Sequence, residues 1–236
     1  MMYQSANLYD ALYAETKDYA KEVSRLHELI TQHKTSSGRK LLDVACGTGQ
    51  HLFFLKNHYE VEGLDINPDF IEISQKKLPQ ATIHKQNMMS FELPTKFDVI
   101  TCLFSSIGYT KTYDCLASTL LNMRKHVKPG GLLIIEPWYT PSTFKPGHFT
   151  ATIQEIDGGK VVRTNHWSQE NGHSQGDSQF LVVNSSGIKH ISEKHVLGLF
   201  SKESYTEALE AAGLKVVYDE HGLIGRGLYV GISPQT

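Results

Sequence analysis

Two glycines and an acidic residue carry the spacing that most directly suggests chemistry. An apolar run, residues 41–45, stops at a turn containing Gly47 and Gly49, and a second apolar run ends at Asp65, 18 residues after Gly47. Glycines let a backbone approach a ligand where a Cβ would collide, and they bring the next helix N-terminus to the same place. A carboxylate at the end of the second strand can accept both hydroxyls of a ribose. The pattern predicts strand, glycine turn, helix and strand, with a nucleoside-bearing cofactor at the turn.

The residues around this turn distinguish between classes of cofactor. The dinucleotide fingerprint G-x-G-x-x-G/A needs a third small residue, but this chain has Leu52 there. The stretch Asp43–Gly49, DVACGTG, instead resembles the first motif of class I S-adenosylmethionine (SAM) dependent methyltransferases. The resemblance implies SAM as the cofactor. A nicotinamide oxidoreductase and a tight turn that binds no ligand are the less favoured alternatives.

Further cofactor contacts are expected at the ends of the following strands. The class I family commonly places an acidic residue against the adenine after the third strand, where this chain has Asn87, and Met88 can pack on the base. The tyrosines Tyr3, Tyr9 and Tyr13 either pack under a terminal helix or form part of a lid over the cofactor. The expected cofactor residues are Asp43, Ala45, Gly47, Thr48, Gly49, Asp65, Ile66, Asn87, Met88, Leu103, Phe104 and Tyr13.

Composition favours a small-molecule substrate. A formal charge of −2 gives no bulk attraction to nucleic acid or to an anionic membrane. Cys46, Cys102 and Cys115 show no C-x-x-C spacing and are expected to be buried free thiols in a reducing cytoplasm. No apolar run of about 18 residues and no signal-peptide pattern predicts membrane insertion or export.

The elements that must position these residues follow an α/β order. Residues 1–37 show helical spacing and are expected to form an N-terminal helical lid. Asn67-Pro68 predicts a helix start, and the nearly continuous apolar run Phe97–Leu103 predicts a strand buried on both faces. An amphipathic helix then ends at Lys128-Pro129-Gly130-Gly131, and Leu132–Glu136 is expected to be the fifth strand.

Composition changes after Pro141. Short alternating runs separated by Asp157-Gly158-Gly159, Asn171-Gly172 and Ser185-Ser186-Gly187 predict an antiparallel β insertion over residues 141–200, which could bind the acceptor or pair in a homodimer. Residues 38–140 and 201–236 are then the cofactor domain. The expected fold is α/β: a Rossmann-like class I methyltransferase sheet of seven strands, the last one antiparallel, with the β insertion attached.

Several segments together resemble one subgroup, the sugar N,N-dimethyltransferases that act on nucleotide-linked amino sugars such as the desosamine and mycaminose precursors. These segments are Tyr9-Asp10, Lys17-Asp18-Tyr19, LLDVACGTG with His51-Leu52, Ile100-Thr101-Cys102 with FSSIG, Glu136-Pro137-Trp138 and Gly225-Arg226-Gly227-Leu228. The chain departs from this subgroup at Asn87, where aspartate is usual, and at Tyr109, where some members carry histidine. The resemblance implies N-methylation of an amino sugar. A different small amine or hydroxyl acceptor, or a SAM-binding protein without chemistry, is the alternative.

Amine methylation needs an unprotonated lone pair, a near-attack geometry and exclusion of water. The departing proton could go to Tyr3, Tyr109 or a nearby histidine. Acceptor contacts are expected at the fourth and fifth strand ends, where aromatic rings and hydroxyls suit a sugar, and the planar fork of Arg226 suits a pyrophosphate. These acceptor residues are Ser105, Ser106, Tyr109, Trp138, Tyr139 and Arg226. No spacing suggests a metal ligand set, and ordinary surface or hairpin roles are expected for His166, His173, His190 and His195.

Overall fold

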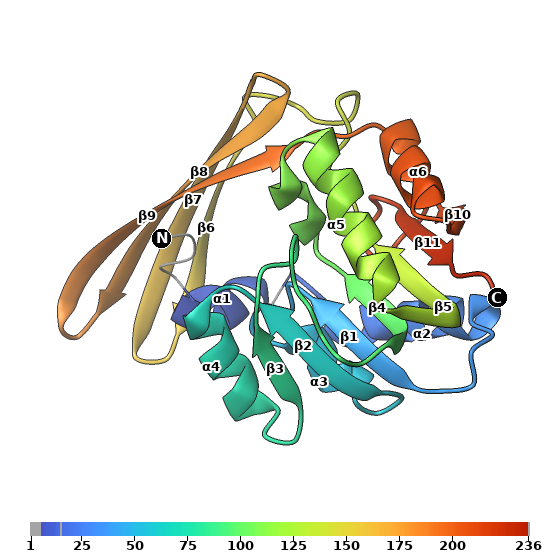
Figure 1. The fold of residues 1–236 in the computed structure, drawn as a ribbon. Coiled ribbons are helices and arrows are strands. Elements are labelled where there is room, and N and C mark those ends of the chain that lie inside the picture. The colour runs from blue at the N-terminus through green and yellow to red at the C-terminus, as the bar shows by residue number, and fades with distance from the viewer. Residues whose placement is uncertain (1–5, 15, 236) are drawn as a thin grey trace.

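The computed structural model describes residues 6–14 and 16–235, and within them a seven-stranded sheet forms the centre of the molecule (Figure 1). Its order is β10-β11-β5-β4-β1-β2-β3; β11 runs antiparallel to both neighbours, and the other pairs are parallel. The prediction of a seven-stranded sheet with an antiparallel last strand is confirmed. The strands are β1 (Lys40–Val44), β2 (Glu60–Asp65), β3 (Thr82–Lys85), β4 (Phe97–Cys102), β5 (Val127–Ile135), β10 (Lys215–Asp219) and β11 (Leu228–Ile232).

Helices cover both faces of this sheet. In chain order they are α1 (Ala6–Tyr13), α2 (Tyr19–His33), α3 (Gln50–Leu55), α4 (Pro68–Lys77), η1 (Ser106–Thr110, a 3-10 helix), α5 (Tyr113–Lys125) and α6 (Lys202–Ala211). α2 and α3 pack on one face, and α5 and α6 pack on the other. Side chains alternate between faces along a strand. Leu41 therefore packs in the core under α2 and α3, and its neighbour Leu42 packs in the core under α5 and α6.

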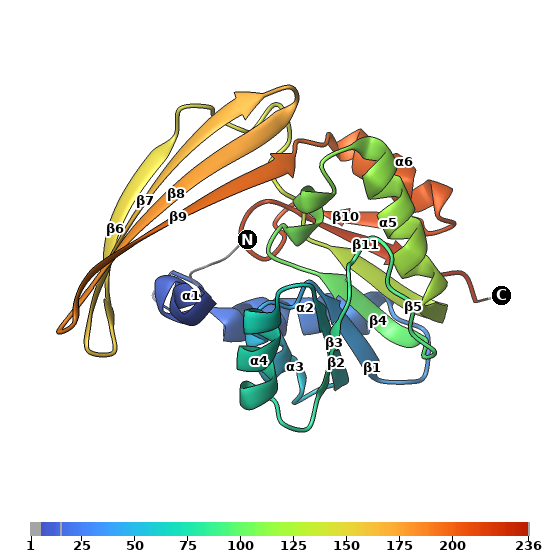
Figure 2. The ribbon, with the colours of Figure 1, turned by 60° about the vertical axis from the view of Figure 1, so that its left-hand side comes forward.

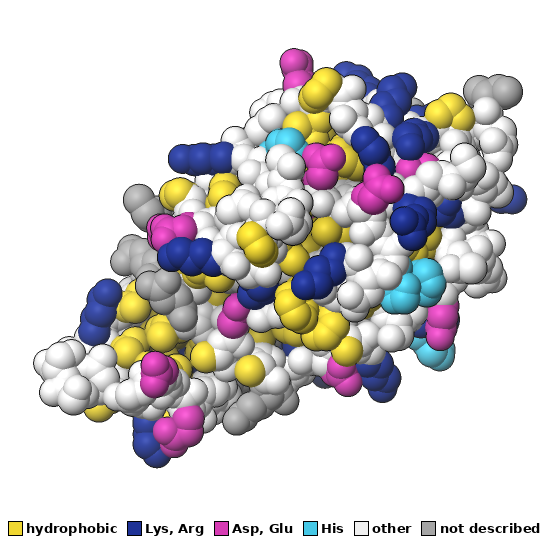
Figure 3. Space-filling model, turned by 90° about the horizontal axis from the view of Figure 1, so that it is seen from below, with side chains coloured by type: hydrophobic (Ala, Val, Ile, Leu, Met, Phe, Trp, Pro, Cys, Tyr) yellow, Lys and Arg dark blue, Asp and Glu magenta, His cyan; other side chains and the backbone are white. Residues whose placement is uncertain are grey.

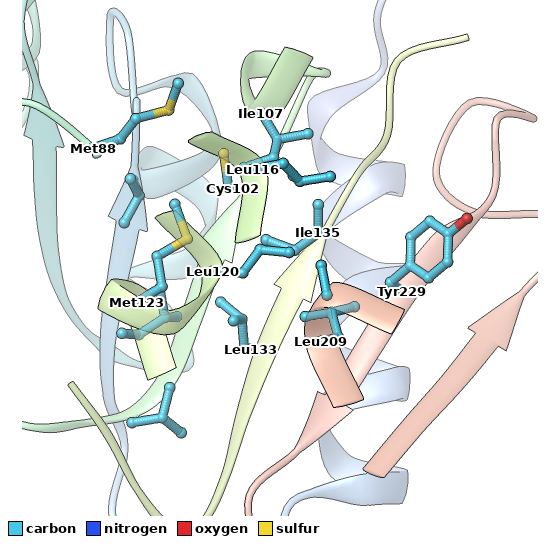
Figure 4. Packing of buried hydrophobic residues seen from close by; sticks show 14 of the residues in the cluster. Met88, Cys102, Ile107, Leu116, Leu120, Met123, Leu133, Ile135, Leu209 and Tyr229 are labelled. Atoms are coloured by element: carbon cyan, nitrogen blue, oxygen red, sulfur yellow. The ribbon is translucent and has the colours of Figure 1, made fainter. Parts of the chain in front are cut away.

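The core under α5 and α6 fixes the two strands whose ends carry candidate acceptor residues. Figure 4 shows Leu120 of α5 and Leu209 of α6 converging on Ile135 of β5. All three side chains are fully buried. Burying one aliphatic side chain contributes about 1.5–3 kcal/mol, so the carboxyl end of β5 is held rigidly.

The strand β5 begins five residues earlier than expected. Val127 already pairs with Phe97, and the register then shifts before Val99 pairs with Leu132. Gly130 adopts a φ of +69° inside this irregular stretch. The Pro-Gly-Gly segment is therefore a bulge within the strand and not the end of the preceding helix, so the expected start at Leu132 was wrong.

A second, four-stranded antiparallel sheet follows β5 in the chain, with strands in sequence order. The strands are β6 (Phe149–Ile156), β7 (Gly159–Glu170), β8 (His173–Asn184) and β9 (Gly187–Gly198). The predicted hairpin turns join them, and Asn171 and Gly172 both have positive φ, as a tight two-residue hairpin requires. Figure 2 shows this sheet as a curved blade that arches over α1. The predicted β insertion is confirmed.

The two N-terminal helices pack on different parts of the molecule. Leu26 and Ile30 of α2 are buried in the core of the large sheet. Leu12 of α1 instead packs against Val161 and Phe180 of the second sheet. The expected lid region thus contains a core helix and a helix that bridges the two sheets.

Within residues 6–14 and 16–235, no helix is long and apolar enough to cross a membrane. Figure 3 shows basic and acidic side chains interspersed over one face of the molecule.

Candidate functional site

A cavity of about 390 Å³ lies at the carboxyl ends of β1, β2 and β3. Its lining includes many of the residues expected to hold the cofactor. They are Ala45, Gly47, Asp65, Ile66, Asn87 and Met88, together with Tyr9, Ser106 and Tyr109. The exposed Ile66 and the buried Met88 offer apolar surfaces that suit a base. The cavity therefore has the lining that an adenosine needs.

The carboxylate of Asp65 joins this cavity to the glycine turn. One of its oxygens accepts the backbone N–H of Gly47 at 2.8 Å, and the other accepts that of Asn67 at 2.9 Å. Burial raises the pKa of Asp65, and these backbone hydrogen bonds oppose that rise. A carboxylate has about four lone-pair sites, so the backbone contacts leave Asp65 able to accept a hydrogen bond from a ribose hydroxyl.

The backbone of the glycine turn is held in unusual conformations. Gly47 and Gly49 have φ of +56° and +74°, and a Cβ on Gly49 would lie 2.4 Å from the Ser74 hydroxyl of α4. Ala45 has φ of +59° without being glycine. Such strain in a non-glycine residue is typical of functional sites, and here it occurs where β1 ends at the cavity.

A smaller cavity of about 40 Å³ continues from the first along the same strand end. Asp43, Ala45, Gly47, Thr48, Leu103 and Phe104 line it, as expected, and Tyr9, Tyr19 and His51 line it in addition. Burial raises the pKa of Asp43 to about 6, although the Thr101 hydroxyl donates to it at 2.7 Å. The Thr48 hydroxyl donates to Asp10 of α1 at 2.5 Å.

A buried charge cluster lies beside this smaller cavity and was not expected from the sequence. Glu22 interacts with Lys17 and with His51 Nε2, each at 2.8 Å, and the Lys17 ammonium lies 4.0 Å from the centre of the Phe104 ring. Burial alone would raise the pKa of Glu22, but the hydrogen bonds to His51 and Lys17 bring it below its usual range. The cluster could hold the charged amino-acid end of SAM. Glu22 and His51 lie 29 residues apart in the sequence. No local sequence pattern therefore reveals the cluster.

The ends of β4 and β5 are locked together by two polar contacts. Glu136 accepts the backbone N–H of Phe104 at 2.6 Å, and the Ser105 hydroxyl donates to the Pro137 carbonyl at 2.7 Å. Phe104 and Ser105 both have positive φ. Ser105 is buried and its hydroxyl holds the two strand ends together through Pro137, and its expected contact with the acceptor stays a prediction.

Arg226 lies among aromatic rings at these strand ends. Its guanidinium carbon is 5.1 Å from the Trp138 ring centre, 5.4 Å from Tyr139 and 6.0 Å from Phe104. Trp138 is held in turn by a 2.8 Å hydrogen bond from its indole N–H to Ser174 of β8. Three of the expected acceptor residues, Trp138, Tyr139 and Arg226, are thus in mutual contact next to Phe104.

Glu136 directly follows β5 and carries a fully buried carboxylate. Its Oε1 atom is buried and has no hydrogen-bond partner in the described part of the chain, whereas Oε2 accepts from Phe104. Burial raises the pKa of Glu136, and the nearby charges of Arg226 and Lys17 oppose the rise. Leaving a buried acceptor unpaired costs about 1–3 kcal/mol. Sequence reasoning included Glu136 only as part of a motif.

Tyr109, expected to take part in catalysis, contacts a histidine of the second sheet. Its hydroxyl lies 2.9 Å from Nδ1 of His195. Of the histidines expected in surface or hairpin roles, His195 is only 8% exposed within its hairpin strand, while His166 and His190 are exposed. The inward-facing positions of a strand alternate with outward ones, and β9 turns His195 inward.

The remaining predicted residues fall in other places. Tyr13 contacts the Phe104 ring at 5.1 Å and is hydrogen-bonded by Arg163 of β7 at 3.2 Å. Tyr3 lies outside the described residues. Cys46 and Cys102 are buried free thiols as predicted, whereas Cys115 is partly exposed. Among the described residues, no cluster of three or more His, Cys, Asp or Glu side chains is arranged to hold a metal ion.

Comparison with known proteins identifies relatives over nearly the whole chain. Residues 41–131 match a family described as "Methyltransferase domain". The dTDP-3-amino-3,4,6-trideoxy-alpha-D-glucopyranose N,N-dimethyltransferase of Streptomyces venezuelae is 39% identical, covering 96% of this chain and 97% of that protein. The dTDP-3-amino-3,6-dideoxy-alpha-D-glucopyranose N,N-dimethyltransferase of Streptomyces fradiae is 38% identical, covering 96% and 90%.

Solved structures agree with these sequence matches. The crystal structure of Streptomyces venezuelae DesVI superposes with a TM-score of 0.92 at 37% identity, covering 99% of this chain and 100% of that one. SAM-bound CalS10, an amino pentose methyltransferase from Micromonospora echinaspora, gives a TM-score of 0.86 at 31% identity, covering 95% and 96%.

Proposed function

Because the chain belongs to the class I SAM-dependent methyltransferases and, within them, to the family of the sugar N,N-dimethyltransferases, we propose that it methylates the amine of a nucleotide-linked amino sugar. Its cofactor is SAM, which supplies an electrophilic methyl group when bound. The dimethylated amine named for the relatives is the product we propose for this chain.

The observation that carries the acceptor assignment is the place of Arg226. Its guanidinium lies among the Trp138 and Tyr139 rings and 6.0 Å from the Phe104 ring, which itself lines the cofactor cavity. A diphosphate needs a cation, and the planar fork of arginine matches phosphate oxygens. The aromatic rings suit the faces of a sugar or a base. This combination fits a nucleotide-linked sugar better than a simple amine.

The two ligand sites meet at the Phe104 turn. Asp65, Ile66, Asn87 and Met88 hold the adenosine side, and the Lys17, Glu22 and His51 cluster holds the charged amino-acid end. The carboxylate of Glu136 accepts the Phe104 backbone N–H and so holds the turn that lies between the two sites. Alignment of two bound reactants can lower the barrier by about 7–11 kcal/mol. The residues therefore act mainly by holding the amine in line and by excluding water.

The helix α1 is the part of residues 1–37 that we assign as the lid. Asp10 accepts from Thr48 of the glycine turn and pairs with Lys77 of α4 at 2.8 Å. Tyr9, on the same helix, lines both cavities. A helix held by side-chain contacts to the cofactor turn can close over the cofactor without moving the large sheet. Pairing of two chains through the second sheet stays a prediction.

A methyl-transfer screen with mass-spectrometric readout tests this function. Aminodeoxy sugars linked to a nucleoside diphosphate, the same sugars without the nucleotide, and unrelated small amines would be compared by kcat/KM. We expect methylation of the nucleotide-linked sugars at a kcat/KM at least tenfold above the others. Methylation only of acceptors that lack the nucleotide would refute the acceptor assignment and leave the cofactor assignment intact.

A further inference from the structure

The hydroxyl of Tyr109 joins the cofactor cavity to a buried pair in the second sheet. Tyr109 lines the cavity with Gly47 and Asp65. Its Oη atom is 2.9 Å from Nδ1 of His195, and Nε2 of the same ring is 3.7 Å from a carboxylate oxygen of Glu193. His195 and Glu193 are 8% and 4% exposed. A hydroxyl, an imidazole and a carboxylate thus follow one another from the cavity into the protein.

The buried pair Glu193 and His195 occupies positions where apolar side chains would pack equally well. Two inward positions of β9 carry Glu193 and His195, whereas Ile191 and Leu197 on the same face are apolar. Burying polar groups costs free energy unless they interact with one another. His195 uses its buried position to contact Tyr109 of η1. This contact connects the buried pair to the cavity.

We propose that His195 receives the amine proton through the Tyr109 hydroxyl, and that Glu193 stabilises the imidazolium that forms. The inference rests on the proposed amine methylation. An acceptor amine in its ammonium form gives a proton to Tyr109 Oη as the Tyr109 hydroxyl gives its own proton to His195 Nδ1. The freed nitrogen lone pair forms the bond to the methyl carbon while the carbon–sulfur bond breaks and its electrons stay on sulfur. One proton per methyl group therefore ends on His195.

The direction of this proton transfer requires one particular tautomer of His195. Nδ1 must be unprotonated to accept from Tyr109, so the resting proton lies on Nε2, which faces Glu193. The neighbouring β8 presents Ser174, Gly176 and Ser178 to this face, with Gly176 opposite His195, and these residues carry no charge. Within the described residues, Tyr109 from η1 and Glu193 from the same strand are titratable groups that face His195.

The decisive variant is His195→Asn, because an asparagine amide can replace the hydrogen bond that Nδ1 makes to Tyr109 but cannot take up a proton. Tyr109→Phe keeps the ring against the cavity and removes only the hydroxyl. The matched control is His190→Asn, which makes the same change on the same strand at an exposed position.

At neutral pH we expect His195→Asn and Tyr109→Phe each to lower kcat by about 100-fold, the low end for a positioned base. The double variant should lose little more, because residues that act as a unit are not additive. The His190→Asn control should stay near wild type, and SAM affinity should stay within about twofold in every variant. The loss of kcat in His195→Asn and Tyr109→Phe should become smaller as pH rises above the pKa of the acceptor amine, since the amine then binds in its neutral form. Full activity of His195→Asn, or a deficit equal at all pH values, would overturn the relay.

A measurement that does not depend on turnover tests the same claim. In ¹⁵N-histidine-labelled protein, the resonances absent from the His195→Asn spectrum should show a protonated Nε2 and an unprotonated Nδ1. A protonated Nδ1 would overturn the proposal. If His195→Asn lowers Tm strongly, the pH profile of Tyr109→Phe gives the kinetic answer. Failure of the wild type to methylate any nucleotide-linked amino sugar would refute the proposed function instead. The NMR measurement of the His195 tautomer would then still test the hydrogen bonding of His195 with Tyr109.

Discussion

The two ligand sites at the edge of the large sheet are built in different ways. The cofactor site at the ends of β1, β2 and β3 draws most of its expected residues from three short segments, each following its own strand. The proposed acceptor site brings together Phe104, Glu136 and Arg226, which lie far apart in the chain, and adds His195 from the second sheet. A common cofactor can be held by a local motif, whereas a particular acceptor needs residues from several elements.

The buried carboxylates show the same difference in their hydrogen bonding. Asp43 at the cofactor end has Thr101 as a partner, and both oxygens of Asp65 accept backbone N–H groups. Glu136 at the acceptor end keeps a buried oxygen without a partner in the described chain. Buried groups whose hydrogen bonds are satisfied stabilise the fold, whereas a buried oxygen without a partner costs stability.

The largest expected effect concerns the stability that depends on Asp43. Burial raises its pKa from 3.8 to about 6, roughly two pKa units, so its protonated form stabilises the fold at low pH and this contribution is lost as pH rises from about 4 through 6. From well below pH 4 to well above pH 6 the wild type should lose about 3 kcal/mol of unfolding free energy relative to Asp43→Asn. Urea unfolding of both proteins across this range measures the difference. Parallel pH profiles would show that Asp43 does not titrate in this way.

The next effect concerns the cofactor. Asp65→Ala should weaken SAM binding by about 10- to 150-fold, because a hydrogen bond to a charged group contributes about 1.5–3 kcal/mol. Loss of the bonds to Gly47 and Asn67 adds to the effect. Isothermal titration with SAM measures it, and Glu60→Ala at the amino end of the same strand is the control. Equal affinity in a folded Asp65→Ala protein would contradict the assigned ribose site.

Arg226 provides the corresponding test in the acceptor site. Arg226→Ala should lower kcat/KM for a nucleotide-linked acceptor by about tenfold while SAM affinity stays within about twofold. Arg226→Lys should recover part of the loss, since it keeps the charge but not the planar fork. The control is Arg39→Ala, an exposed arginine at the amino end of β1. A matching loss of SAM affinity would mean that the two sites are not separate.

The smallest effect belongs to Asn87. Its side-chain oxygen accepts the backbone N–H of Met89, and the residue lines the cofactor cavity. Asn87→Ala should cost about 0.5–1.5 kcal/mol of SAM affinity, the range for a neutral hydrogen bond. Asn87→Asp should tighten binding, because a charged acceptor makes a stronger hydrogen bond than a neutral amide oxygen. Weaker SAM binding by Asn87→Asp in the same titration would contradict a contact to the adenine amino group.

Sequence reasoning succeeded where the signal was local. The glycine turn and the hairpin turns each depend on a few neighbouring residues, and the structure contains them. The antiparallel end of the sheet, which the family resemblance implied, is also present. It failed at Leu132, where a bulge lets β5 begin at Val127 and depends on pairing with β4. It also missed the contact of Glu22 with His51 and that of His195 with Tyr109, because only folding brings those partners together.

The most direct test of the proposed function is the position of the transferred methyl group. The protein would be incubated with SAM carrying a trideuterated methyl and an aminodeoxy sugar linked to thymidine diphosphate, and the product would be examined by mass spectrometry and NMR. We expect two labelled methyl groups, both on the sugar nitrogen. Label on a hydroxyl oxygen, or none on the nucleotide-linked sugar, would contradict the proposal.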